Sequence, residues 1–257
     1  MSKKLVVANW KMHLNTSQAS LLVHRLQERI RIHREVEIVI APSMLVLQPL
    51  SLQIDRRKFR LAAQNAYFKD QGAFTGEVSF TMLQDLVHYT IIGHSERRIY
   101  FNETLEEIRE KVAASVRNNI TPILCVGETK QEKKLGEGKQ VLHDQIVSAL
   151  SNLTSSEVED IVIAYEPVWA ISTFDGELAK PYDVQKAMDH IRLEINELYG
   201  KKASERVRVI YGGSVDDKDV AGYLDIEGCD GVLVGSASLN YLQFAAIVDT
   251  AYQISLK

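Results

Sequence analysis

The chain has 257 residues, of which 46% are hydrophobic and 25% are charged, and its formal net charge at pH 7 is −4. This composition excludes a disordered or fibrous protein, and the near balance of charges gives no indication of a nucleic acid as partner. The two cysteines, Cys125 and Cys229, are too few for a disulfide framework or a metal site.

Short β-rich runs recur from the N-terminus onward, with helical stretches between them. Most are continuously apolar, which is typical of strands buried on both faces of a parallel sheet. The first run is too short for a signal-peptide core or a membrane span, so we expect a cytoplasmic protein without membrane contact. The expected strands are Leu5–Ala8, Val36–Ala41, Phe59–Ala63, Thr90–Ile92, Pro122–Val126, Ile161–Tyr165, Val207–Tyr211 and Gly231–Val234.

The segments between the strands have the spacing of amphipathic helices. Apolar residues recur at helical intervals over residues 19–30, 105–116 and 184–198. Asn102 or Thr104 is expected to cap the second of these helices. Because no linker or shift in composition divides the chain, we predict one catalytic domain over residues 1–257.

Alternating strands and helices predict a parallel sheet, either open and doubly wound or closed into a barrel. An open sheet usually carries a glycine-rich dinucleotide motif after its first strand, and Asn9-Trp10-Lys11-Met12 does not match it. Eight repeats in a chain of this length favour a single (β/α)8 barrel of the α/β class.

Polar residues follow several predicted strands, and the loops after barrel strands converge on one face. Glu166 leaves an apolar strand directly into Pro167, which holds its backbone extended and aims a carboxylate suited to abstracting a carbon-bound proton. A salt-bridged glutamate at a strand end is the alternative interpretation.

His94 precedes Ser95, which has the character of a helix cap. An imidazole beside a helix N-terminus is favoured in its neutral form and can donate a hydrogen bond to a carbonyl. Lys11 at the barrel mouth is suited to attracting an anion and stabilising a developing enolate. The alternatives are an ordinary core histidine and a solvated lysine.

Gly212-Gly213-Ser214 and Gly235-Ser236 follow the seventh and eighth strands. In barrels these two loops commonly bind phosphate through backbone N–H groups, although turns also need glycines. A phosphate site beside an enolising acid/base pair predicts an aldose–ketose isomerase that acts on a sugar phosphate.

Longer motifs resemble those of the triosephosphate isomerase family, in the same order and over nearly the whole chain. They are Asn9-Trp10-Lys11-Met12, Gly72-Ala73-Phe74-Thr75-Gly76-Glu77, Gly93-His94-Ser95-Glu96-Arg97-Arg98, Cys125-Val126-Gly127-Glu128, Ala164-Tyr165-Glu166-Pro167-Val168-Trp169-Ala170 and Tyr211-Gly212-Gly213-Ser214-Val215.

The resemblance implies the interconversion of dihydroxyacetone phosphate and D-glyceraldehyde 3-phosphate, a reaction of glycolysis and gluconeogenesis, with no metal or organic cofactor. It implies that Glu166 is the base and that His94 polarises the carbonyl oxygens. Lys11, assisted by Asn9, is expected to bind the anionic substrate, and Glu96 is expected to position Lys11.

The resemblance also implies a lid and a homodimer. The lid is expected to begin at Trp169 and to close in coordination with Tyr211 and Ser214. Thr75 is expected to reach the active site of the neighbouring subunit. The residues implied in substrate binding through the phosphate are Ser172, Ser214, Gly235 and Ser236.

The chain departs from the family pattern in the lid and in one phosphate loop. Ser172 and Phe174 stand where the family has glycines, a short insertion precedes Pro181, and Ser236 replaces a glycine. We therefore expect a working site whose lid closes differently. A longer lid leaves open an isomerase of four-carbon ketose phosphates. A Schiff-base aldolase and a non-catalytic barrel are the remaining alternatives.

Overall fold

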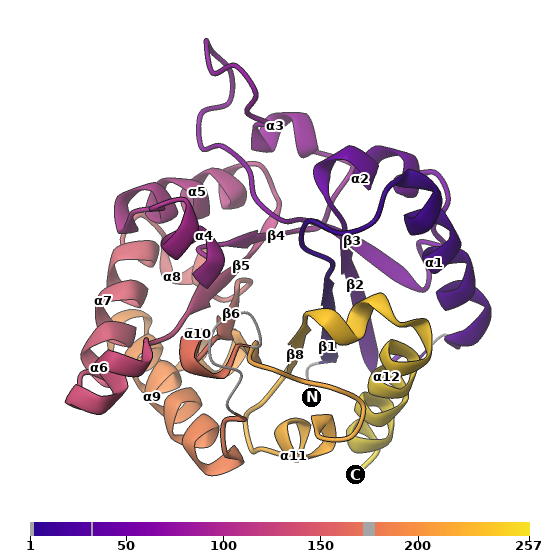
Figure 1. Ribbon diagram of the computed structural model, residues 1–257. Coiled ribbons are helices and arrows are strands. Elements are labelled where there is room, and N and C mark those ends of the chain that lie inside the picture. The colour runs from indigo at the N-terminus through magenta and orange to yellow at the C-terminus, as the bar shows by residue number, and fades with distance from the viewer. Residues whose placement is uncertain (1–2, 32, 172–177) are drawn as a thin grey trace.

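The structure is a computed structural model that describes residues 3–31, 33–171 and 178–257. Parallel strands form a closed barrel in which each strand pairs with the next and β8 pairs with β1 (Figure 1). The predicted single (β/α)8 barrel is therefore confirmed. The strands are β1 (Lys4–Asn9), β2 (Val36–Ala41), β3 (Phe59–Ala63), β4 (Tyr89–Ile92), β5 (Thr121–Val126), β6 (Val162–Tyr165), β7 (Arg208–Tyr211) and β8 (Gly231–Val234).

Helices surround the barrel and cover its outer face (Figure 1). Thr104 caps α5, because its side chain accepts from the N–H of Glu107 and the Glu107 carboxylate accepts from the N–H of Thr104. The helices are α1 (Thr16–Arg29), α2 (Met44–Ser51), α3 (Phe80–Leu83), α4 (Ser95–Tyr100), α5 (Leu105–Arg117), α6 (Lys130–Leu135), α7 (Gly138–Leu150), α8 (Ser155–Val158), α9 (Pro181–Tyr199), α10 (Lys201–Arg206), α11 (Val220–Leu224) and α12 (Tyr241–Ser255), with short 3-10 helices η1 (Val168–Ala170) and η2 (Ser236–Leu239).

Two apolar layers explain why the strand sequences are continuously apolar. Alternate strand residues such as Leu5 and Val7 fill the barrel interior, while their neighbours Val6 and Ala8 pack outward in the layer shared with the helices. Among the described residues, no helix is both long and apolar enough to cross a membrane.

A polar network fills the end of the barrel where the strands begin. Arg208 donates to Glu37 and to the Tyr89 hydroxyl, at 2.8 Å each, and the Tyr89 hydroxyl donates to Glu37 at 2.9 Å. Burial raises the pKa of Tyr89 to about 12, so its hydroxyl keeps its proton. The network joins β2, β4 and β7 across this end.

Candidate active site

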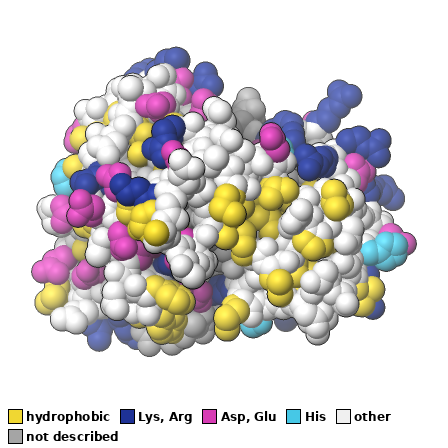
Figure 2. Space-filling view, turned by 90° about the horizontal axis from the view of Figure 1, so that it is seen from above, with side chains coloured by type: hydrophobic (Ala, Val, Ile, Leu, Met, Phe, Trp, Pro, Cys, Tyr) yellow, Lys and Arg dark blue, Asp and Glu magenta, His cyan; other side chains and the backbone are white. Residues whose placement is uncertain are grey.

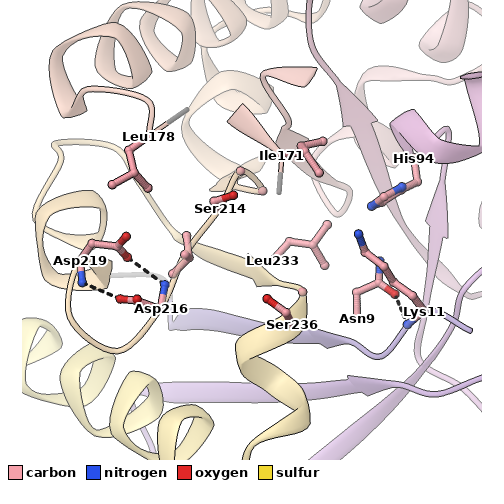
Figure 3. A pocket seen from close by; sticks show the side chains of 14 residues that line it. Asn9, Lys11, His94, Ile171, Leu178, Ser214, Asp216, Asp219, Leu233 and Ser236 are labelled. Atoms are coloured by element: carbon pink, nitrogen blue, oxygen red, sulfur yellow. Dashed lines mark hydrogen bonds between the residues drawn. The ribbon is translucent and has the colours of Figure 1, made fainter. Parts of the chain in front are cut away.

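A cavity of about 190 Å³ lies at the carboxyl ends of the strands (Figure 3). Ile171 and Leu178 line this cavity. Residues 172–177, which lie between them in the sequence, are outside the described part of the chain. The expected residue Ser172 and the substituted Phe174 therefore lie outside the described residues. The predicted site residues that line the cavity are Asn9, Lys11, His94, Ser214, Gly235 and Ser236.

Lys11 has a left-handed backbone conformation, with φ +49°, directly after β1. Its N–H donates to Asn9 Oδ1 at 3.0 Å, and its carbonyl accepts from Gln64 Nε2 at 2.9 Å. Its ammonium group donates to Glu96 Oε1 at 2.6 Å. The backbone contacts and the carboxylate together fix a positive charge at the cavity.

His94 is the N-cap of α4, and its Nδ1 accepts from the N–H of Glu96 at 3.2 Å. The expected cap at Ser95 is wrong, because Ser95 is already the first helical residue. An Nδ1 that accepts a hydrogen bond carries no proton, so the neutral ring has its proton on Nε2. His94 lines the cavity, and its Nε2 lies 3.4 Å from Glu166 Oε1.

Glu166 follows β6 but does not line the cavity in this structure. Its side chain is buried, and Oε2 accepts from the N–H of Ser95 at 3.2 Å. The surrounding backbone leaves room for it only because Gly212 is glycine, since a Cβ there would lie 2.7 Å from Glu166 Cγ.

Burial raises the pKa of the Cys125 thiol, and the negative charge of Glu166 raises it further. Cys125 is therefore a buried neutral thiol.

The two glycine loops face each other across the cavity (Figure 3). Ser236 begins η2, whose first N–H groups have no partner within that helix. The N–H of Ser214 donates to the Ala170 carbonyl at 3.0 Å. The hydroxyls of Tyr211 and Ser214 are buried and have no hydrogen-bond partner among the described residues. Tyr211 does not line the cavity.

Trp169, at the expected beginning of the lid, is held by two groups. Its indole N–H donates to Glu128 Oε1 at 2.8 Å, and the ammonium of Lys133 lies 3.2 Å from the centre of its ring. The Tyr165 hydroxyl donates to the same Glu128 carboxylate at 3.1 Å. The sequence does not predict this role of Glu128, although Cys125-Val126-Gly127-Glu128 places it two residues after a strand.

A second cavity, of about 480 Å³, adjoins the first and shares Asn9, Lys11 and His94 with it. Met12 and Phe101 line this second cavity. Thr75 does not; it is exposed on the segment between β3 and α3 that projects from the body of the barrel (Figure 1). Among the described residues, no group of three or more His, Cys, Asp or Glu side chains is arranged to hold a metal ion.

Comparison with known proteins gives one consistent result. A family model described as triosephosphate isomerase matches residues 4–251. The chain is 40% identical over 249 residues to the triosephosphate isomerase of Carboxydothermus hydrogenoformans, covering 96% of this chain and 98% of that protein. It is 40% identical over 250 residues to that of Clostridium tetani, covering 97% of each. It is 41% identical over 249 residues to that of Citrifermentans bemidjiense, covering 96% and 98% respectively.

Proposed function

The chain belongs to the triosephosphate isomerase family, and from this premise we propose how its residues carry out the reaction. It is an aldose–ketose isomerase that interconverts dihydroxyacetone phosphate and D-glyceraldehyde 3-phosphate. The proposed chemistry moves protons only, through an enediolate, and calls for no metal or organic cofactor. We further propose that residues 1–257 form one catalytic domain that works in the cytoplasm, where glycolysis takes place.

The position of His94 is the observation that carries the mechanism. Its proton is on Nε2, on the side of the ring that faces Glu166, because Nδ1 is occupied by the N–H of Glu96. A neutral Nε2–H at the cavity donates a hydrogen bond to the carbonyl oxygen and stabilises the charge that develops there. The ammonium of Lys11 adds a fixed positive charge to the same site, and Asn9 holds the backbone that carries it.

Glu166 is the proposed base. Its carboxylate leaves the N–H of Ser95, turns toward the cavity, takes a proton from one substrate carbon and returns it to the adjacent carbon. The loops at Ser214 and at Gly235-Ser236 hold the phosphate with backbone N–H groups, after the N–H of Ser214 has left the Ala170 carbonyl. Ser172 is proposed to add a further phosphate contact, and Tyr211, whose buried hydroxyl has no described partner, is proposed to bind the closed lid.

A homodimer is part of the proposal. Part of the segment of residues 64–79 projects from the barrel (Figure 1), and Phe74 and Thr75 in this segment are exposed. The second cavity lies beside Lys11 and His94 and has apolar side chains, among them Met12, on its wall. We propose that this cavity receives the projecting segment of a second copy, which brings Thr75 next to the partner's active site.

The test is steady-state isomerisation of both trioses by the wild-type chain and by Glu166→Gln. The amide keeps the shape of the side chain and removes the base, so we expect kcat to fall by about 10³-fold. Glu106→Gln, on the exposed surface of α5, is the matched control and should keep full activity.

Each outcome has a distinct meaning. A wild-type chain that converts neither triose contradicts the proposed site, and a Glu166→Gln variant with most of its kcat contradicts the base assignment. A four-carbon ketose phosphate assayed in parallel should be a poor substrate, and a preference for it would change the assigned substrate.

A further inference from the structure

The active-site cavity carries two carboxylates at the end away from Lys11. Asp216 and Asp219 line it together with Ser214, and Figure 3 shows them on the side opposite His94. Asp216 is only two residues beyond Ser214, so the two Cα atoms are at most about 8 Å apart. Two acidic side chains therefore adjoin the loop that is proposed to hold the phosphate.

A turn fixes these two side chains in place. The N–H of Asp216 donates to Asp219 Oδ1 at 2.9 Å, and the N–H of Asp219 donates to Asp216 Oδ1 at 3.2 Å. The N–H of Lys218 also donates to Asp216 Oδ1, at 2.7 Å. These contacts need an oxygen acceptor, which a neutral amide also supplies. The hydrogen bonds of the turn therefore explain why residues 216 and 219 carry side-chain oxygen atoms, but they do not explain why these side chains are negatively charged.

No positive side chain of the described residues is among the groups that act most strongly on Asp219. Burial raises the pKa of Asp219, and the charges of Asp216 and Asp217 raise it further, against backbone hydrogen bonds that lower it. The phenols of Tyr211 on β7 and Tyr223 on α11 also interact with it, and burial raises their pKa values, so they stay uncharged. Among the described groups that act on Asp219 are thus the acids of its own turn, Asp216 and Asp217, and two uncharged phenols on β7 and α11.

We propose that Asp216 and Asp219 determine specificity by limiting the negative charge that the site accepts. A phosphate monoester fits between the two glycine loops, whereas a ligand with a second anionic group beyond that phosphate brings this group against the two carboxylates. The site thereby selects monophosphates over diphosphates. The inference rests on the phosphate site of the proposed function.

The experiment compares inorganic phosphate with pyrophosphate as competitive inhibitors of triose isomerisation at pH 8. Asp219→Asn and Asp216→Asn keep the oxygen acceptors of the turn and remove one charge each. We expect either variant to bind phosphate about threefold more tightly and pyrophosphate at least about tenfold more tightly, because like charges at this range repel. This gain in the affinity of the variants should become smaller at high salt, because salt screens the repulsion between like charges.

Asp217→Asn is the matched control. Asp217 is in the same turn but does not line the cavity, and its Oδ1 accepts from Gln243 Nε2 of α12 at 3.0 Å. Inhibition constants for this variant should stay within about twofold of wild type. An equal gain in Asp217→Asn indicates the overall charge of the turn and overturns the proposal. An equal gain in affinity for phosphate and pyrophosphate also overturns the proposal. The absence of any gain in affinity in both Asp216→Asn and Asp219→Asn overturns it as well.

Calorimetric titration of the same anions separates this inference from the proposed function, because it needs no turnover. If the wild-type chain does not isomerise trioses but Asp219→Asn still gains pyrophosphate affinity, the function is wrong and the charge limit stands. If the wild-type chain isomerises trioses but Asp219→Asn gains no pyrophosphate affinity, the proposed function stands and the proposed role of the two carboxylates is wrong.

Discussion

At the scale of single residues, Lys11 shows how the site is organised. Its left-handed backbone conformation costs about 1–3 kcal/mol for a residue with a Cβ. Asn9 accepts from its N–H, Gln64 donates to its carbonyl, and Glu96 accepts from its ammonium. These contacts offset the strain, and they aim the side chain at the cavity.

We predict that Glu96→Gln lowers kcat/KM by about 10- to 100-fold. The variant replaces a carboxylate that lies 2.6 Å from Lys11 Nζ with a neutral amide, so the ammonium loses the charge that positions it. Steady-state kinetics with both trioses measure the effect, and Glu106→Gln is the control. Unchanged kcat/KM would show that the backbone contacts alone position Lys11.

The sequence predicts which residues form the site better than it predicts how they are arranged. Lys11, His94 and Glu166 stand out because each follows an apolar strand, and barrel topology then brings them to one end. The cap at His94 and the contact of Glu166 with Ser95 depend on side-chain rotamers, and these are set by neighbours from other strands. The spacing of residues along the chain does not show which residues of other strands become these neighbours.

At the scale of elements, Glu103 connects the helices behind the site. Its side chain is buried and accepts from Arg97 of α4 at 3.0 Å and from the Lys111 ammonium of α5. Lys111 also donates to Asn65, which follows β3, at 2.9 Å. Burial alone raises the pKa of Glu103, but Lys111 and Arg97 outweigh burial and hold the pKa below its usual value.

We predict that Glu103→Gln lowers the free energy of unfolding by about 2–4 kcal/mol at pH 7, because it leaves a buried ammonium without its counter-charge. A carboxyl whose folded pKa is lowered contributes stability above its unfolded pKa, about 4.3, and loses that contribution as the pH falls through the folded value. The difference between variant and wild type should therefore shrink below about pH 4. Urea unfolding at fixed protein concentration measures it.

Glu106→Gln is again the control and should change the free energy of unfolding by less than about 0.5 kcal/mol at either pH. A loss that stays constant from pH 7 to below pH 4 would show that packing, not the charge of Glu103, stabilises this region.

The strands and three of the longer helices, α1, α5 and α9, were predictable because their apolar patterns are regular. The apolar runs place all eight strands, with end residues that differ by at most one position, such as Tyr89 instead of Thr90 at the start of β4. Short helices such as α6 and α10 were not predicted separately, since six residues give less than two turns of periodicity. Gly136 ends α6 and Gly200 precedes the first residue of α10, and both glycines have positive φ.

At the scale of the whole molecule, one face shows a group of exposed apolar side chains. The space-filling view of the side that bears α3 shows apolar side chains gathered in its middle (Figure 2). Met12 is 93% exposed, and Phe74, Met82 and Phe101 are exposed as well. Met12 and Phe101 line the second cavity together, and exposed apolar surface gathered in this way is typical of an interaction site, in agreement with the proposed homodimer.

The projecting segment is preformed for such an interface. The rings of Tyr67 and Phe74 lie 4.7 Å apart, and the N–H of Tyr67 donates to the Val78 carbonyl at 2.8 Å. Gly72 and Gly76 have positive φ, and a Cβ at Gly72 would lie 2.6 Å from the Phe74 ring. Little conformational entropy remains to be lost when the segment docks, which favours association.

We therefore predict that Thr75→Arg converts the proposed dimer into monomers and lowers kcat by at least about 100-fold. The new guanidinium would enter the partner's cavity beside Lys11, where two positive charges repel. Sedimentation velocity over a range of protein concentrations gives the assembly state, and activity at the same concentrations links it to catalysis. Ser156→Arg, on exposed α8, adds the same charge elsewhere and should leave a fully active dimer. A Thr75→Arg variant that remains dimeric and active would place the interface on another face.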